Sequence, residues 1–228
     1  MNPTPNRSET TPHRVRHLLL IAVVLGAGSV FGLGAEEQWV PLFNGQDLDA
    51  FAFHLGKEGA GNDGTFTVRD GVLICTGSPA GYLYTKKSYS RYTLKYDWKF
   101  LRPEDLQDDK TFRSNSGCLI HIGEKNALGV WPRSIEVQGS HNQAGLILPI
   151  PRNLQCRVTD DKEARAKALK PVGTWQTTTI DVDAGNMTIS LNGSVVSTVR
   201  DCELTEGPIG FQSEGKEIHM KNIQILLK

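Results

Sequence analysis

Residues 92–100 alternate between large apolar and polar side chains more regularly than any other part of the chain. The apolar positions are Tyr92, Leu94, Tyr96, Trp98 and Phe100. Successive side chains of a β-strand point to opposite faces of its sheet, so this period of two residues predicts a strand with one buried face. A fold that contains the segment must cover its apolar face with a second layer.

Two turn motifs predict hairpins elsewhere in the chain. Asp70-Gly71 and Asn192-Gly193 each stand between two short runs of alternating apolar residues. Both central residues of the favoured two-residue turn need positive φ, which Asn, Asp and Gly adopt most readily. Many short strands separated by turns predict an all-β fold, an antiparallel β-sandwich or jelly roll with one short helix.

The helical candidate runs from Asp160 to Lys170. Asp160 is the expected N-cap, with Glu163 three residues later, and Pro171 is expected to stop the helix. Residues 146–157, which two prolines interrupt, are expected to be irregular or to lie at a sheet edge.

The first 35 residues have the order of a secretory signal peptide. Arg14 and Arg16 precede the apolar run 18–25, and small residues follow before Glu36. We therefore expect residues 36–228 to form one exported domain, periplasmic or extracellular, with no stable membrane span after signal removal. An uncleaved N-terminal anchor is the alternative.

The charge balance argues against a nucleic-acid partner. The chain has 25 Lys and Arg against 25 Asp and Glu, a formal net charge of zero, and no basic stripe. The four cysteines, Cys75, Cys118, Cys156 and Cys202, form no C-x-x-C pair. Up to two disulfides or buried free thiols both fit this spacing, and three pairings are open.

Polar side chains collect in residues 114–141. In Ser134–Gln138, alternation turns Ile135 and Val137 to a core and Glu136 and Gln138 to the other face. The same pattern sets Asn115, Gly117, Leu119 and His121 on one face of the preceding strand, with Cys118, Ile120 and Ile122 on the other. Two such neighbouring strands would bring an amide, an imidazole and a carboxylate into one sugar-sized polar site.

Several segments resemble the 3-keto-disaccharide hydrolase family and occur in the same order as in that family. They are Leu42–Leu48, Asp70–Leu73, Tyr82–Lys86, Asn115–Gly117, Ile135–Gln138, Leu191–Gly193 and Gly207–Gln212. Residues 130–134 and the Asp160 helix are similar to the planctomycete-type branch of the family. The resemblance covers nearly all of the chain after residue 36.

The resemblance implies a jelly roll of the concanavalin A-like lectin and glucanase type. It also implies an enzyme that cleaves 3-keto-glycosides, with a carbohydrate substrate. The sequence departs from the family pattern after Gln138, where Gly139, Ser140 and His141 stand in place of a nearby acidic residue. The E-x-D-x-x-E run of retaining glucanases is absent, so ordinary two-carboxylate glycoside hydrolysis is not indicated.

A ketone at C3 acidifies the C2 proton, so the reaction needs a base, an enolate stabiliser and an acid. Glu136 is the candidate base, or else a structural partner of a basic residue. Arg133 and Asn115 are the candidates to hold the enolate oxygen or the sugar hydroxyls, and Arg133 is equally a candidate ion-pair partner of Glu136. His121 and His141 are candidate acids, or buried structural histidines.

The remaining candidates would bind the sugar. Asn115, Gln138 and Gln212 are expected to contact hydroxyl groups, and Trp131 to stack on a sugar face. Asn115 as a turn residue and Trp131 as packing are the structural alternatives. A divalent cation held by Glu136 and His121 is the alternative enolate stabiliser. The rival function is a non-catalytic carbohydrate-binding, lectin-like domain on the same sandwich, and a cell-surface structural domain is the third alternative.

Overall fold

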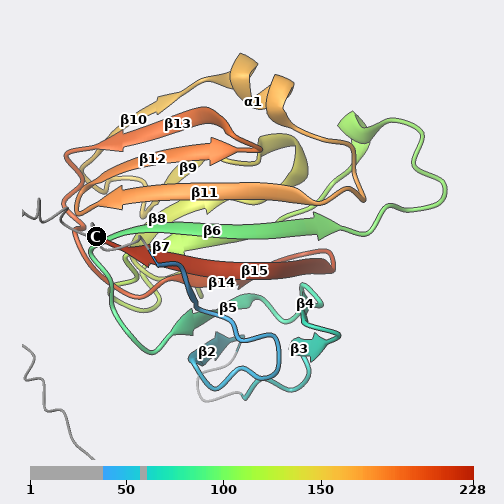
Figure 1. Cartoon of the computed structure of the whole chain (residues 1–228), viewed down its shortest axis with the longest axis horizontal. Coiled ribbons are helices and arrows are strands. Elements are labelled where there is room, and N and C mark those ends of the chain that lie inside the picture. Colours follow the sequence, from blue (N-terminus) through green and yellow to red (C-terminus); the bar gives the residue numbers. More distant parts are fainter. Residues whose placement is uncertain (1–37, 57–60) are drawn as a thin grey trace, which may run out of the picture. The chain divides into compact units, whose positions relative to one another are not determined.

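A computed structural model describes residues 38–56 and 61–228 of the chain. The expected signal peptide, residues 1–35, lies outside the described residues. Across the described ranges the chain forms two antiparallel sheets, one of nine strands and one of six. In Figure 1 strands β13, β12, β11, β6 and β15 lie in front of the fainter β9, β8 and β7. This is the predicted all-β sandwich.

The nine-stranded sheet has β6 and β15 near its middle. In spatial order its strands are β10 (Arg157–Asp160), β13 (Ser194–Arg200), β12 (Asn186–Leu191), β11 (Gln176–Asp183), β6 (Arg91–Phe100), β15 (Ile218–Leu227), β4 (Val72–Cys75) and β3 (Phe66–Arg69), and β1 (Val40–Pro41) also pairs with β15. Burial along β6 alternates as predicted, with Tyr92, Leu94 and Trp98 turned into the core.

The six-stranded sheet carries most of the candidate site residues. Its order is β2 (Phe51–Leu55), β5 (Gly81–Thr85), β14 (Gly210–Ser213), β7 (Gly117–Ile120), β8 (Ser134–Gln138) and β9 (Ile147–Ile150). Strand β9 is an edge strand, as one of the two expectations for residues 146–157 had it. The hairpins at Asp70-Gly71 and Asn192-Gly193 both form, and all four residues have positive φ.

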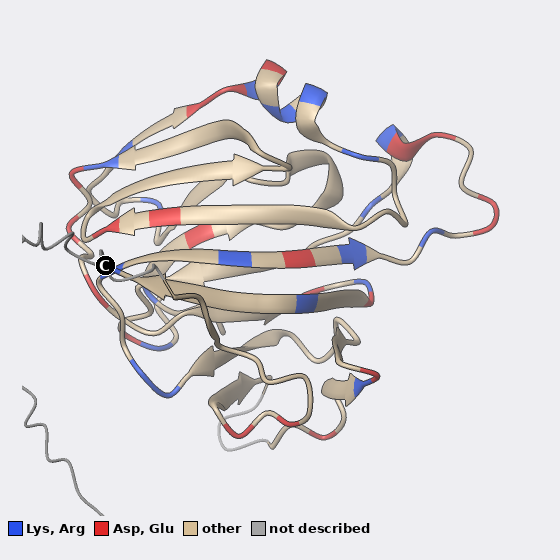
Figure 2. Cartoon of the chain, in the orientation of Figure 1, with Lys and Arg blue, Asp and Glu red and all other residues tan. Residues whose placement is uncertain are grey.

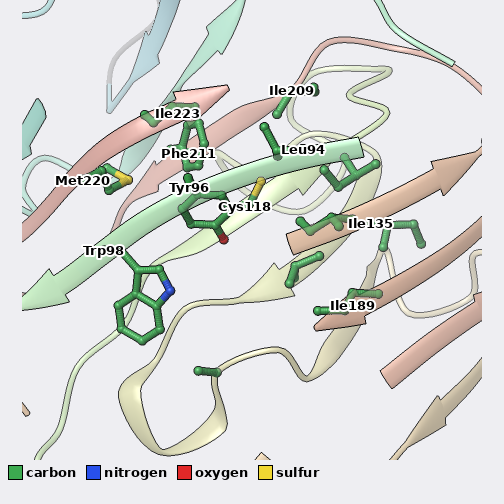
Figure 3. Close-up of a cluster of buried hydrophobic side chains, with 14 of the residues drawn as sticks. Leu94, Tyr96, Trp98, Cys118, Ile135, Ile189, Ile209, Phe211, Met220 and Ile223 are labelled. Atoms are coloured by element: carbon green, nitrogen blue, oxygen red, sulfur yellow. The ribbon is translucent and has the colours of Figure 1, made fainter. Parts of the chain in front are cut away.

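The core lies between the two sheets. Figure 3 shows side chains from both sheets meeting there, among them Leu94, Tyr96, Cys118, Ile135 and Phe211. Burying apolar surface contributes about 25 cal/mol per Å², so this interior is the main source of stability. Each strand of the six-stranded sheet therefore has one face turned to this core and one turned away from it. We call the second face the outer face.

The helix α1 spans Lys162–Ala168, and its boundaries differ slightly from the prediction. The N-cap is Asp161, not Asp160, and its carboxylate accepts a hydrogen bond from the Ala164 amide at 2.8 Å. Asp160 ends β10 and forms an ion pair with Arg165. Two 3₁₀ turns, Asp109–Thr111 and His141–Gln143, occur in loops. No described helix is long and apolar enough to cross a membrane.

Residues of both charge signs are spread along the chain. Figure 2 shows Lys and Arg interspersed with Asp and Glu, including along β6. This pattern agrees with the zero formal net charge.

Candidate functional site

Strand β8 turns its side chains as the sequence predicted. Ile135 and Val137 lie in the inter-sheet core, and Glu136 and Gln138 point to the outer face. Glu136 is only 6% exposed although it carries a carboxylate. A carboxylate kept from water at a sheet face costs free energy, so its surroundings decide its chemistry.

Gly117 on the neighbouring strand leaves room for this carboxylate. A Cβ atom added to Gly117 would stand 3.0 Å from Glu136 Oε1, 2.9 Å from Glu136 Cγ and 2.4 Å from Gln212 Oε1. Both oxygens therefore lie within a few ångströms of one point above β7. The glycine lets Glu136 and Gln212 approach each other across the strand between them.

The surroundings of Glu136 shift its titration to neutral pH. Burial, together with the charge of Glu214, raises the pKa of Glu136 from 4.5 to about 7. The Gln212 amide and the Arg152 charge act in the opposite direction. Burial also raises the pKa of Glu214, whose carboxylate is stabilised by Asn115. Asn115, Glu136, Arg152, Gln212 and Glu214 form what we call the Glu136 cluster.

Two buried polar atoms on the outer face have no hydrogen-bond partner. They are Gln212 Oε1 and Tyr82 Oη, on residues that pair directly across β14 and β5. Burial raises the pKa of Tyr82, so its hydroxyl stays protonated. Buried polar atoms are nearly always satisfied in folded proteins, so this unpaired acceptor and this unpaired hydroxyl lack the partners that such atoms normally have.

Gln138 and Trp131 lie on the outer face with different contacts. Gln138 Oε1 accepts a hydrogen bond from the Ser140 amide at 2.7 Å. Trp131 packs against a small apolar cluster beside the polar one. That cluster contains Tyr82, Leu119, Ile122 and Ile150, with Tyr84 also packed against it.

His121 does not share a face with Asn115 and Leu119, which corrects the expectation. His121 has φ of 56°, so the strand alternation ends there and Ile122 turns outward instead. The fully buried ring packs edge-on to Tyr92, and its Nδ1 donates to the Leu204 carbonyl oxygen at 3.1 Å. Burial lowers the pKa of His121.

Arg133 and His141 likewise have partners other than Glu136. Arg133 forms an ion pair with Glu203 at 2.9 Å, so the expected Arg133–Glu136 pair does not occur. Residues 133, 135 and 137 alternate with Glu136 along the chain, so an extended backbone turns the Arg133 side chain to the face opposite to that of Glu136. His141 is buried edge-on to Trp98.

The expected metal ligands Glu136 and His121 do not come together. The His121 ring turns to the core side and donates from Nδ1 to the chain itself. Within residues 38–56 and 61–228 no three His, Cys, Asp or Glu side chains are grouped to hold a metal ion. Glu136 and His121 therefore do not form a shared cation site in this fold.

A polar hollow of about 500 Å³ lies at the nine-stranded sheet and is lined in part by Lys95, Asp97 and Asn222. Asp97 accepts hydrogen bonds from Thr177 Oγ1 at 2.6 Å and Asn222 Nδ2 at 2.7 Å. Since both Asp97 oxygens are occupied, this carboxylate has less reason to be catalytic than the largely desolvated Glu136. We therefore take the Glu136 cluster as the candidate site.

Two members of the Glu136 cluster were missed by sequence reasoning. Glu214 continues the alternation of Gly210 and Gln212 by one more step, so the pattern could have identified it. Arg152 follows the edge strand β9 in a loop, where no periodicity indicates which way a side chain points.

Comparison with known proteins gives one match to a protein-family model. A family model described as a 3-keto-alpha-glucoside-1,2-lyase-like domain matches residues 38–226. A search of curated proteins finds no match.

Solved structures of low sequence identity share the fold. A putative glycosyl hydrolase from Parabacteroides distasonis aligns with a TM-score of 0.59 at 20% identity, over 84% of this chain and 95% of that chain. The carbohydrate binding module CBM66 from Bacillus subtilis aligns with a TM-score of 0.52 at 11% identity, over 79% and 97%. A Bacillus subtilis protein with a galectin-like fold reaches 0.53 at 11% identity, over 83% and 94%. These similarities confirm the predicted jelly-roll class.

Proposed function

Because the chain belongs to the family of 3-keto-alpha-glucoside-1,2-lyase-like domains, we propose that it cleaves 3-keto-glycosides, with Glu136 as the base. The family is carbohydrate-active, and the proposal adds the bond and the residue. The observation that carries it is a nearly buried carboxylate with a pKa near 7, next to an unpaired amide oxygen on the same sheet face.

The reaction begins at C2 of the oxidised sugar. The ionised Glu136 removes the C2 proton, and the electron pair of that C–H bond forms an enolate with the C3 ketone. The enolate then re-forms the ketone, makes a C1–C2 double bond and breaks the bond between C1 and the glycosidic oxygen. Glu136 passes its proton to the departing oxygen, so the carboxylate is regenerated.

Hydration completes the cleavage. Water adds its oxygen to C1 of the unsaturated ketone while C2 takes a proton, which Glu136 carries from the water. The sum of both stages is one water consumed and one glycosidic bond broken. No oxidant or reductant is needed.

The environment of Glu136 suits it to both proton transfers. A general base works best when its pKa lies near the operating pH, because it is then both ionised and basic. Desolvation raises the pKa of Glu136 to about 7, whereas an exposed glutamate would be a much weaker base. Glu214 adds a negative charge nearby, and we assign it the role of keeping Glu136 basic.

The unpaired atoms nearby match the other needs of the reaction. Gln212 Oε1 is an acceptor for a sugar hydroxyl, and the protonated Tyr82 hydroxyl is a donor. Arg152 supplies a positive charge that interacts with Glu136, and we assign it, instead of Arg133, to the developing enolate oxygen. Asn115, beside Glu214, is a further candidate for a sugar hydroxyl.

The test is incubation of the purified protein with a 3-keto-disaccharide, followed by measurement of released sugar with and without a chelator. Release in both arms supports the proposal as written. Release only without chelator would show that a cation is needed besides the residues named here. Saturable binding without release would instead support the lectin-like alternative.

We propose further that the protein is exported to the periplasm or the cell exterior. The support is the order of basic, apolar and small residues in positions 1–35. N-terminal sequencing of protein from its host should find a start near Glu36. A membrane-bound product that retains Met1 or Asn2 would indicate an anchor.

A further inference from the structure

An irregular pairing continues from the start of strand β10 and the end of strand β13, and it brings two cysteines together. Arg157 pairs with Arg200, and beyond this pair the amide of Glu203, three residues after Arg200, donates to the carbonyl oxygen of Gln155, two residues before Arg157, at 3.1 Å. Between these pairs, Cys156 alone stands opposite both Asp201 and Cys202. Asp201 has φ of 52°, as expected for the extra residue of a β-bulge.

Both thiols face the same side of this strand pair. Cys202 is part of the inter-sheet core, and the half-buried Cys156 packs against that core. The Cys202 thiol lies beside Cys156 and partly offsets the burial that raises the pKa of the Cys156 thiol. Opposed side chains on a common face of two antiparallel strands have Cβ atoms about 5 Å apart, close to the separation of about 4 Å that a disulfide needs.

The other two cysteines, Cys75 and Cys118, lie in different sheets from each other. Cys75 is on β4, and its thiol donates to the Gln212 carbonyl oxygen at 3.8 Å. Cys118 is on β7 and is buried beside Tyr96. Each of these thiols has a contact of its own and no strand neighbour with a thiol on the same face.

We propose that Cys156 and Cys202 form a disulfide when the protein meets a disulfide oxidant, and that Cys75 and Cys118 remain thiols. The reaction is thiol–disulfide exchange. One thiolate attacks the oxidant's S–S bond to give a mixed disulfide, and the second displaces the oxidant's other half. The two cysteines lose two protons and two electrons, and the oxidant is reduced to two thiols.

The bond would also fix one side of the candidate site. Cys156 ends the segment 151–156, which follows β9 and carries Arg152. At present the segment is held to β13's end by the Gln155–Glu203 contacts, including Gln155 N to Glu203 Oε1 at 2.8 Å. A covalent link at Cys156 would restrict the positions available to Arg152. The proposal itself does not depend on the catalytic assignment.

The experiment uses the full chain, first reduced and then incubated with oxidised glutathione at about pH 8.5, where a larger fraction of each thiol is ionised than at neutral pH. Peptides from a non-reducing digest are then weighed. The expected result is one cross-linked pair, Cys156 with Cys202, lighter by two hydrogens than the separate peptides. Cys75 and Cys118 should react with an alkylating agent only after unfolding.

Thermal unfolding gives a second readout. The oxidised protein should melt roughly 5–15 °C above the reduced protein, because the cross-link restricts the unfolded chain. Cys156→Ser and Cys202→Ser should each abolish this difference, and Cys75→Ser should retain it. A cross-link to Cys75 or Cys118, glutathione adducts without a cross-link, or an equal Tm in the two states would overturn the proposal.

Discussion

Replacing Glu136 by Gln should stabilise the fold at alkaline pH while leaving it almost unchanged at acid pH. The pKa of Glu136 is raised from 4.5 to about 7 in the folded protein. The folded state thus binds the Glu136 proton more tightly than the unfolded state does. Stability from this group is complete below pH 4.5 and is lost as the pH rises through about 7.

The size of the effect follows from the shift. Each pKa unit corresponds to about 1.4 kcal/mol, so the free energy of unfolding should fall by about 3 kcal/mol across this range. Glu136→Gln keeps the shape but removes the titration. The variant should therefore exceed the wild type by up to about 3 kcal/mol near pH 8 and match it near pH 4.

Urea unfolding at a series of pH values measures this directly. Glu104→Gln is the matched control, because Glu104 is exposed in a loop away from both sheets' cores and should show no such gain. A stability difference between Glu136→Gln and the wild type that stays constant from about pH 4 to 8 would refute the reasoning. So would a variant that is less stable than the wild type near pH 8.

Three further variants test the surroundings of Glu136. Glu214→Gln removes a negative charge that raises the pKa of Glu136, so the pH midpoint of turnover should move to lower pH, and an unmoved midpoint would contradict that coupling. Tyr82→Phe removes a buried hydroxyl that has no partner, so Tm should stay the same or rise while kcat/KM falls by up to about tenfold. A lower Tm with unchanged kcat/KM would show that the hydroxyl stabilises the fold and does not act on the substrate. Gly117→Ala puts a methyl group 2.4 Å from Gln212 Oε1 and should cost about 1–3 kcal/mol of stability and most of the turnover. Unchanged turnover in Gly117→Ala would separate Gln212 from the reaction.

The strand pattern was readable because sheet geometry leaves little freedom. Ile135 and Val137 had to share a face, and only one face of β8 could meet the second sheet. The same rule, applied one residue earlier, would have excluded an Arg133–Glu136 pair. Arg133 instead meets Glu203, which is distant in sequence. The Arg133–Glu136 alternative rested on charge complementarity alone, whereas strand alternation turns the two side chains to opposite faces.

His121 could not have been read correctly from alternation alone. Its positive φ ends the strand and swaps the faces of His121 and Ile122. Positive φ is uncommon for a residue other than glycine, and here the ring is held by the Leu204 carbonyl oxygen. Arg152 was missed for a related reason, since loops follow the packing of the whole fold and not a local period.

The helix boundary shows the usual limit of local signals. Asp160 and Asp161 are both good N-caps, and the sequence does not choose between them. Strand β10 extends through Asp160, so Asp161 is the first residue after the strand and becomes the N-cap.

The measurement that tests the central claim most directly is turnover of a 3-keto-glucoside by the wild type, Glu136→Gln and Glu104→Gln, with hydrogen or deuterium at C2. Loss of the base should lower kcat by about 10²–10⁴-fold in Glu136→Gln and leave Glu104→Gln at the wild-type rate. The wild type should react more slowly with the deuterated substrate, because the C2–H bond breaks in the first step. Wild-type kcat in a folded Glu136→Gln variant would contradict the assignment of Glu136 as the base.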